Sequence, residues 1–262
     1  MAGTTTRRAV VRVTDQAVSA PDDLAVEAPL VLGLHGTPIA TLMRTPGHDI
    51  ELTAGWLVVE SGVRAPQDVR TLRQCSDDGT DRVHITLAEG VRSPRPRAFV
   101  TSAACGVCSA DVIDLAPLRT SAPHTPGWTV DRDVLAALPD EMRARQRAFA
   151  RTGAVHAAAL ADRAGRLVVV REDVGRHNAV DKVVGHALLD GKLPATDQLL
   201  VVSGRVSFEI VQKAVAAGVA GIVAVSAPSS LAVDLCREYD LLLAGLVRGA
   251  RMNLYSGAEL VC

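Results

Sequence analysis

The chain has 262 residues, of which 48% are apolar and only 3% are aromatic. Its 28 lysine and arginine residues are balanced by 29 aspartate and glutamate residues, which leaves a net charge of −1. This composition is typical of a folded α/β protein. It excludes a disordered chain and a protein that attracts nucleic acid through its overall charge.

Two further observations concern the cellular setting. No segment reaches the roughly 18 consecutive apolar residues of a membrane-spanning helix, so we expect no membrane association. The five cysteines are odd in number and have no regular spacing, which argues against a secreted disulfide framework. We therefore expect a cytoplasmic protein.

The N-terminal part, residues 1–120, is predicted to be rich in hairpins. Its first 25 residues are polar and predict an edge strand or a tail. Apolar runs of strand length then occur at residues 29–35, 38–45, 69–75 and 82–87. The first pair is separated by Gly36-Thr37 and the second by the turn sequence Asp77-Asp78-Gly79, so each pair predicts a hairpin. Between the hairpins, residues 48–62 show the periodicity of a helix.

The C-terminal part, residues 121–262, shows alternating strands and helices. A helix is predicted over residues 131–151, kinked or broken at Pro139. A hairpin follows over 154–161 and 167–171. The strand-to-helix units are 167–170 into 174–189, 198–202 into 207–218, and 221–225 into 229–239, and a last strand from 241–246 continues towards Tyr255. The alternation predicts a largely parallel sheet covered on both faces, and an α/β fold class.

Ligands of such sheets bind beyond the carboxyl ends of the strands. Here this rule selects three polar loops, at residues 172–177, 203–205 and 226–230. Helix N-termini open at these loops and suit a phosphate-bearing ligand such as a nucleotide, together with Arg205, Arg248 and Arg251. There is no P-loop and no G-x-G-x-x-G motif, so NTP hydrolysis and Rossmann-type binding are unsupported.

Other polar residues near these loops leave alternatives open. His156 is either a hydrogen-bonded strand residue or part of the site. His177 and Asp181 are spaced to hydrogen bond on one helical face. The basic stretch of Arg143, Arg145, Arg147 and Arg151 is interpreted first as a solvated or ion-paired face, with phosphate contact as the alternative.

The candidate residues for sulfur chemistry are the two cysteines of Cys105-Gly106-Val107-Cys108, which are surrounded by small residues. Such a pair serves structural zinc, dithiol redox chemistry or persulfide transfer. Zinc needs two further ligands. Cys75, Cys236 and Cys262 stand alone in the sequence, and we expect them to be buried structural residues and the protein to hold no metal. Sequence spacing does not decide between redox chemistry and persulfide transfer.

Several motifs together resemble the formate dehydrogenase accessory sulfurtransferase (FdhD) family. These motifs lie at residues 101–108, 152–156, 172–182, 203–209, 226–228 and 248–255. Their order and spacing match over roughly residues 29–257. Ser109 and Ala154 replace glycines that are common in the family, and these small changes leave the sulfur assignment intact.

The resemblance implies a core of three layers similar to that of cytidine deaminases, without their zinc chemistry, and a homodimer. It also implies a sulfur carrier that takes sulfur from a cysteine desulfurase. The acceptor that the resemblance implies is the bis-molybdopterin guanine dinucleotide form of the molybdenum cofactor, before its insertion into formate dehydrogenase. In this sequence Cys105 matches the persulfide-bearing cysteine of the family, and the resemblance implies that Cys108 assists or resolves the transfer.

The cofactor is thus expected as a bound substrate, and a guanine nucleotide such as GDP as its mimic. The family's cofactor-contacting stretch matches Leu246-Val247-Arg248-Gly249-Ala250-Arg251. The strand-end residues predicted to join it are Ser203, Gly204, Arg205, Ser226 and His177.

Overall fold

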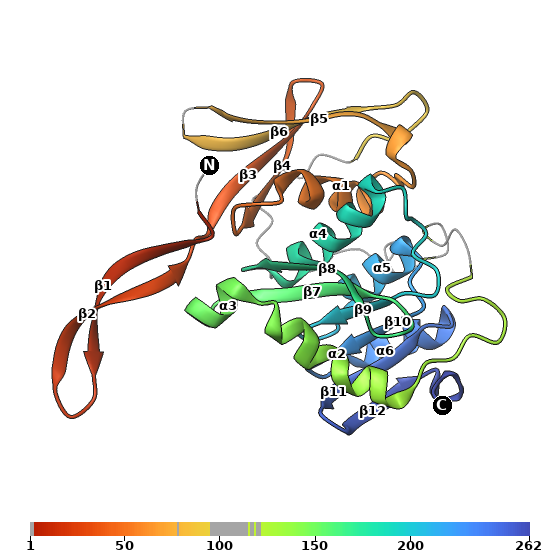
Figure 1. The fold of residues 1–262 in the computed structure, drawn as a ribbon. Helices are drawn as coiled ribbons and strands as arrows, with labels where there is room; N and C mark the ends of the chain where they lie inside the picture. Colours follow the sequence, from red (N-terminus) through yellow and green to blue (C-terminus); the bar gives the residue numbers. More distant parts are fainter. Residues whose placement is uncertain (1–2, 78, 95–114, 116–117, 119–121) are drawn as a thin grey trace.

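The computed structural model describes residues 3–77, 79–94, 115, 118 and 122–262. A six-stranded sheet lies at the centre of the larger part of the molecule, and a four-stranded sheet lies beside it (Figure 1). A two-stranded hairpin projects away from both (Figure 1).

The six-stranded sheet has the order β12-β11-β10-β9-β7-β8. Its strands are β7 (His156–Ala161), β8 (Leu167–Asp173), β9 (Leu199–Val202), β10 (Gly221–Ala224), β11 (Leu242–Arg248) and β12 (Arg251–Ser256). β9, β10 and β11 pair in parallel, whereas β7 pairs antiparallel with both β8 and β9, and β12 pairs antiparallel with β11. Four strands therefore share one direction, and the largely parallel sheet that the sequence predicts is in fact mixed.

Two predictions about this sheet need correction. β7 lies between β8 and β9, so the first strand-to-helix unit does not join neighbouring strands. The last strand does not continue to Tyr255, because a turn at Gly249, with φ of 54°, reverses the chain into β12. A glycine adopts this positive φ without the steric cost that other residues meet.

Helices cover both faces of the sheet (Figure 1). One face packs against α4 (Arg176–Leu189), α5 (Phe208–Ala217) and α6 (Ser230–Glu238), and the other packs against α2 (Arg132–Ala144). Successive strand residues alternate between the two cores: Leu160 joins the first and Ala159 the second. The predicted α/β class and its layers of helix, sheet and helix are confirmed. No helix within the described residues is long and apolar enough to span a membrane.

The four-stranded sheet has the order β4-β3-β6-β5, and both predicted hairpins are confirmed. Its strands are β3 (Ala28–Leu34), β4 (Thr37–Arg44), β5 (Val69–Asp77) and β6 (Thr80–Leu87), with a 3-10 turn η1 (Pro66–Asp68) before β5. The predicted helix is α1 (Asp49–Glu60), which crosses α4 at Gly55 and Gly185. A side chain on either glycine would collide with the backbone of the other helix, so these glycines permit the crossing that joins the two sheets through one core.

The helix predicted over 131–151 is two helices, α2 and α3 (Arg147–Thr152). The break falls at Arg145-Gln146 and not at Pro139, which lies inside α2. The cause is a distant carboxylate: Glu172 of β8 accepts hydrogen bonds from the N–H groups of Ala148 and Phe149, at 2.9 and 2.7 Å. These contacts satisfy the free N–H groups of a new helix start.

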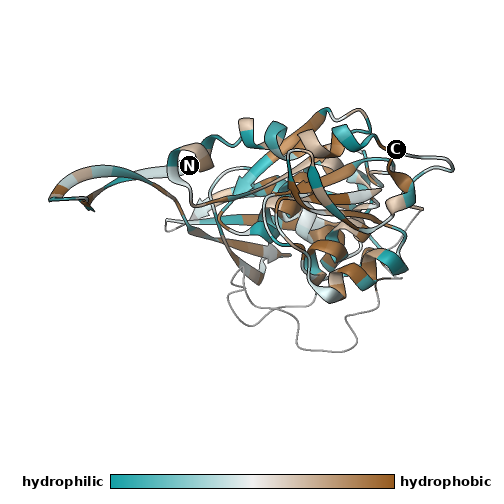
Figure 2. Ribbon diagram, turned by 90° about the horizontal axis from the view of Figure 1, so that it is seen from below, coloured by the Kyte–Doolittle hydropathy of each residue, from teal (hydrophilic) through white to brown (hydrophobic). Residues whose placement is uncertain are grey.

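The N-terminal residues form neither an edge strand nor a tail. β1 (Thr5–Val13) and β2 (Ala17–Ala25) pair with each other in a hairpin that we name the arm. The arm projects from the body in both ribbon views (Figures 1 and 2). At the base of the arm, Asp23 forms an ion pair with Arg151 of α3, with 3.0 Å between Asp23 Oδ2 and Arg151 Nη2.

Candidate functional site

The carboxyl ends of β8, β9, β10 and β11 meet at one edge of the main sheet, which we name the carboxyl edge. The antiparallel β7 contributes its first residue, His156, to the same edge. Hydrogen bonds join two of the predicted loops and the end of β11 there: Val206 N–H donates to Ala227 O at 3.3 Å, and Leu246 N–H donates to Ser226 O at 3.2 Å. The loop at 172–177 lies beside them, because a Cβ on Gly204 would lie 3.4 Å from Arg176 Cδ. The three loops selected from the sequence therefore lie together.

His156 faces the loop after β9. The hydroxyl of Ser203 lies 3.4 Å from His156 Nδ1 and accepts a hydrogen bond from Ala157 N–H at 2.9 Å. Gly204 allows this approach, because a Cβ there would lie 3.3 Å from His156 Nδ1 and 3.4 Å from Arg176 Cδ. Of the two alternatives left open for His156, its position favours a role in the site.

Positive charge gathers around His156. Burial lowers the pKa of His156, and the nearby Arg176, His177 and Arg205 lower it further, while Asp173 opposes them. The Nε of Arg176 is buried and has no hydrogen-bond partner among the described residues. A buried guanidinium nitrogen without a partner is costly, so this N–H group is available to an anionic or polar ligand or to a water molecule.

A cavity of about 540 Å³ opens beside His156, and we name it the carboxyl-edge cavity. Its lining consists of Pro139, Met142, Arg143, Gln146, Phe149, Gly153, Ala154, Val155, His156, Val174, Ser203 and Val225. The guanidinium of Arg143 lies 3.9 Å from the centre of the Phe149 ring and donates to Gln146 Oε1 at 3.2 Å. The α2–α3 break thus supplies one wall, with an aromatic ring and a cation.

Arg145 and Arg151 of the basic stretch have partners elsewhere. Arg145 donates to Leu167 O at 3.1 Å, and Arg151 pairs with Asp23 of the arm. The ion-paired interpretation therefore fits Arg151, whereas Arg143 lines the cavity. The sequence showed the basic stretch but not the helix break that separates its members.

A buried ion pair holds the loop after β8. The Nζ of Lys182 lies 2.7 Å from Asp173 Oδ2, and both side chains are almost fully buried. The other carboxylate oxygen accepts from Gly175 N–H and from the Asn178 amide at 2.9 and 3.0 Å. Burial raises the pKa of Asp173 above its ordinary value, and the positive charge of Lys182 opposes that rise. These contacts fix the start of α4, and with it Arg176.

The predicted hydrogen bond between His177 and Asp181 is not the pairing found. His177 Nε2 lies 2.7 Å from Glu209 Oε2, and Asp181 instead accepts from Lys213 Nζ at 2.6 Å. The His177 imidazole holds the pKa of Glu209 below its ordinary value. Both partners come from α5, which packs against α4.

The predicted cofactor stretch forms the turn between β11 and β12. Arg248 and Arg251 are exposed and pair across this turn, whereas Val247 is buried in the core and offers no side chain to a ligand. Leu246, at 37% exposure, has a positive φ and hydrogen bonds the Ser226 loop, which ties the stretch to the carboxyl edge.

Cys105 and Cys108 lie outside the described residues. Of the remaining cysteines, Cys236 is buried as expected, and burial raises the pKa of its thiol to about 12. Cys75 is half-buried and Cys262 is exposed, so the expectation of burial is wrong for Cys262. Within the described ranges, no group of three or more histidine, cysteine or acidic side chains could hold a metal ion.

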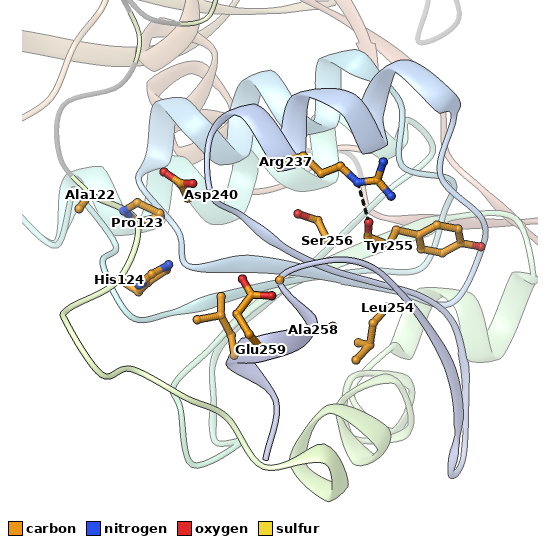
Figure 3. A pocket seen from close by; sticks show the side chains of 12 residues that line it. Ala122, Pro123, His124, Arg237, Asp240, Leu254, Tyr255, Ser256, Ala258 and Glu259 are labelled. Carbon is orange, nitrogen blue, oxygen red and sulfur yellow. Dashed lines mark hydrogen bonds between the residues drawn. The ribbon is translucent and has the colours of Figure 1, made fainter.

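A second cavity, of about 530 Å³, lies where β12 ends beside the first residue of β11 (Figure 3). We name it the amino-edge cavity. Its charged and aromatic lining includes His124, Arg237, Asp240, Tyr255 and Glu259 (Figure 3). Arg237 Nε donates to Tyr255 O at 3.1 Å. None of the predicted site residues that the structure describes lines this cavity.

Comparisons with known proteins agree with the motifs. The family model described as the FdhD/NarQ family matches residues 25–262. A protein of Streptomyces coelicolor named sulfur carrier protein FdhD is 48% identical over 100% of this chain and 97% of its own length. Proteins of the same name from Mycobacterium tuberculosis and Sulfolobus acidocaldarius are 43% and 38% identical, and cover 94% and 92% of this chain and 94% and 92% of their own lengths.

A solved structure from Desulfotalea psychrophila has a similar fold. It is described as that of a formate dehydrogenase accessory protein, and it matches with a TM-score of 0.81 at 23% identity, over 99% of this chain and 100% of the other. At this identity, the match shows a shared fold.

Proposed function

Because this chain belongs to the FdhD/NarQ family, we propose that it is a sulfur carrier that serves formate dehydrogenase. Relatives of nearly equal length, named as sulfur carriers, support this function. The observation that carries the site assignment is the Nε of Arg176, which is buried without a partner among the described residues beside His156 and a cavity.

We propose Cys105 as the carrier. Its thiolate attacks the outer sulfur of a persulfide on a cysteine desulfurase, so that one S–S bond breaks, another forms, and the desulfurase thiolate leaves. For delivery, Cys108 attacks Cys105, which releases hydrosulfide to the acceptor and leaves a Cys105–Cys108 disulfide. A cellular dithiol then reduces this disulfide for the next cycle.

The proposed acceptor is the bis-molybdopterin guanine dinucleotide cofactor, bound as a substrate at the carboxyl edge. Its phosphates would contact Arg176 and the exposed Arg205, Arg248 and Arg251, where anions are favoured. The apolar side chains of the carboxyl-edge cavity, with Gln146 and Ser203 as polar partners, suit a guanine ring. GDP is therefore the expected mimic.

We further propose that the carrier acts in the cytoplasm and as a homodimer. A reducing compartment keeps both thiols of the pair available. The cofactor carries two guanine nucleotide ends, so a two-fold symmetric pair of carboxyl edges would hold one end each.

Complementation tests this proposal. In a bacterial host that lacks its own carrier, the wild-type chain is expected to restore formate dehydrogenase activity, and Cys105→Ala is expected to abolish the restoration. Cys262→Ala, which removes an exposed thiol elsewhere, is the matched control and is expected to restore activity fully. Full restoration by Cys105→Ala would overturn the carrier role, and would leave a protein that only binds the cofactor.

A further inference from the structure

Two consecutive carboxylates, Glu172 and Asp173, lie at the end of β8. Cross-strand partners project to the same side of a sheet, and successive residues of a strand project to opposite sides. Glu172 lies opposite Ala157, which belongs to the core that α2 covers. Asp173 lies opposite His156 and contacts Lys182 of α4. The two carboxylates therefore point to opposite faces of the sheet.

Each of these carboxylates fixes the start of one helix. Asp173 Oδ1 accepts a hydrogen bond from Gly175 N–H at 2.9 Å, directly before α4. Glu172 uses both of its oxygens: Oε2 accepts from Ala148 N–H at 2.9 Å, and Oε1 accepts from Phe149 N–H at 2.7 Å. The first N–H groups of a helix have no partner within that helix, so Glu172 supplies the partners that let α3 start there.

The start of α3 forms one wall of the carboxyl-edge cavity. Phe149 lines this cavity, and so does Gln146, the buried residue directly before α3. Gln146 Oε1 accepts from Arg143 Nη1 at 3.2 Å, and the Arg143 guanidinium lies 3.9 Å from the centre of the Phe149 ring. The arrangement of these three side chains thus depends on where the chain leaves α2 and begins α3.

We infer that Glu172 is a positioning residue for ligand binding at the carboxyl-edge cavity. Glu172 does not line the cavity. It acts through the start of α3, which holds the Phe149 ring and the Arg143 guanidinium in place. The neighbouring Asp173 fixes the start of α4, so consecutive residues of one strand order both sides of the site. This inference rests on the proposed nucleotide site at the carboxyl edge.

A second carboxylate of the same hairpin offers a matched control. Asp162, in the turn between β7 and β8, also accepts two backbone hydrogen bonds, from Ala164 N–H at 3.0 Å and from Arg166 N–H at 2.9 Å. This turn lies at the opposite end of β8 from Glu172, and Asp162 does not line the carboxyl-edge cavity. Asp162→Asn therefore changes the same kind of contact away from the site.

Amide hydrogen exchange of the full chain without ligand, followed by mass spectrometry, tests the contact itself. In Glu172→Gln, one acceptor oxygen becomes an NH2 group that cannot accept a hydrogen bond. The amides of residues 147–152 are therefore expected to exchange about five-fold faster. Asp162→Asn is expected to leave the exchange of this segment within about two-fold of the wild type. Unchanged exchange in Glu172→Gln would overturn the inference, whether or not the protein binds a nucleotide.

The Kd for GDP of the full chain, measured by calorimetry, tests the link to the cavity. Glu172→Gln is expected to raise this Kd by about three-fold, and Asp162→Asn is expected to leave it unchanged. The decisive variant combines Glu172→Gln with Phe149→Leu. Because Glu172 acts through Phe149, the double variant is expected to bind GDP almost as well as Phe149→Leu alone. A residue that only stabilises the fold would not show this dependence on Phe149.

Two results would overturn the inference while leaving the nucleotide site intact. One is a Kd that Glu172→Gln does not change, in a protein whose wild type binds GDP. The other is a double variant in which the two losses of affinity add in full, which would leave Glu172 as a residue of the fold alone. A wild type that does not bind GDP would contradict the proposed nucleotide site itself, and the inference would fall with it.

Discussion

The two edges of the main sheet carry cavities of nearly equal volume, about 540 Å³ at the carboxyl edge and about 530 Å³ at the amino edge. Their chemistry differs. The first lies beside a cluster of cations around His156, with an unpartnered buried nitrogen on Arg176, whereas the second is lined by Asp240 and Glu259 as well as Arg237. Volume therefore does not distinguish the two cavities, and our proposal of the carboxyl edge as the binding site rests on strand direction and on the unpartnered Nε of Arg176.

The largest expected effect is the loss of stability when the buried ion pair at the carboxyl edge is broken. Lys182→Met leaves Asp173 buried without its cation, and we expect the free energy of unfolding to fall by about 3–5 kcal/mol. Urea unfolding measures the change. Arg237→Met at the amino edge removes one exposed hydrogen bond and is expected to change stability by less than about 0.5 kcal/mol. Equal losses in the two variants would break the comparison.

Ligand affinity gives the next effect. Arg176→Gln removes a cation from the carboxyl edge while keeping a side chain that can hydrogen bond. We expect the Kd for GDP, measured by calorimetry, to rise by about 10-fold or more, as for the loss of a charged hydrogen bond. Arg237→Gln, at the amino-edge cavity, serves as the matched control and is expected to leave the Kd unchanged. If only Arg237→Gln weakens binding, the nucleotide site belongs to the other edge.

A smaller effect is expected from the wall of the carboxyl-edge cavity. Phe149→Leu keeps an apolar side chain but removes the ring beside Arg143. We expect the Kd for GDP to rise by about five-fold, the worth of one aromatic contact of about 1 kcal/mol. Leu254→Ala, in the lining of the amino-edge cavity, should have no effect on this Kd. An unchanged Kd in Phe149→Leu would show that the guanine base of GDP does not contact this wall of the cavity.

The smallest expected effect is on the pH dependence of the free energy of unfolding at acid pH. His177 holds the pKa of Glu209 below its ordinary value, so the unfolded chain takes up this proton first as the pH falls. The stabilisation is present above the ordinary pKa and is lost as the pH falls through the lowered folded value. Unfolding measured between about pH 6 and pH 3 should therefore depend less on pH in Glu209→Gln, by about 1 kcal/mol or less. An identical pH dependence would contradict the role of this pair.

Local patterns predicted the elements well, because periodicity and turn residues act over short distances. The hairpins at 29–45 and 69–87 and the helices after β8, β9 and β10 are all confirmed. The errors arise where a residue far away in the sequence determines where an element begins or which strand it pairs with. Glu172 starts α3 from a strand 24 residues away, and β7 enters the sheet between β8 and β9, a pairing that no local pattern contains.

The site shows the same division. The rule that ligands gather at strand carboxyl ends brought Ser203, Gly204 and Ser226 correctly to one edge. The predicted partner of His177 was wrong. Helical spacing favoured Asp181, whereas the carboxylate that pairs with His177, that of Glu209, comes from another helix. Arg176 stood in a predicted loop, but only its buried Nε, which has no partner among the described residues, distinguishes it from the neighbouring charges.

The central claim is that Cys105 carries sulfur, and intact-protein mass spectrometry after incubation with a cysteine desulfurase and cysteine tests it most directly. The account predicts a gain of one sulfur atom on the wild type, mapped to Cys105, and no gain on Cys105→Ala. The same gain on Cys105→Ala, or a wild-type mass that does not change, would contradict it.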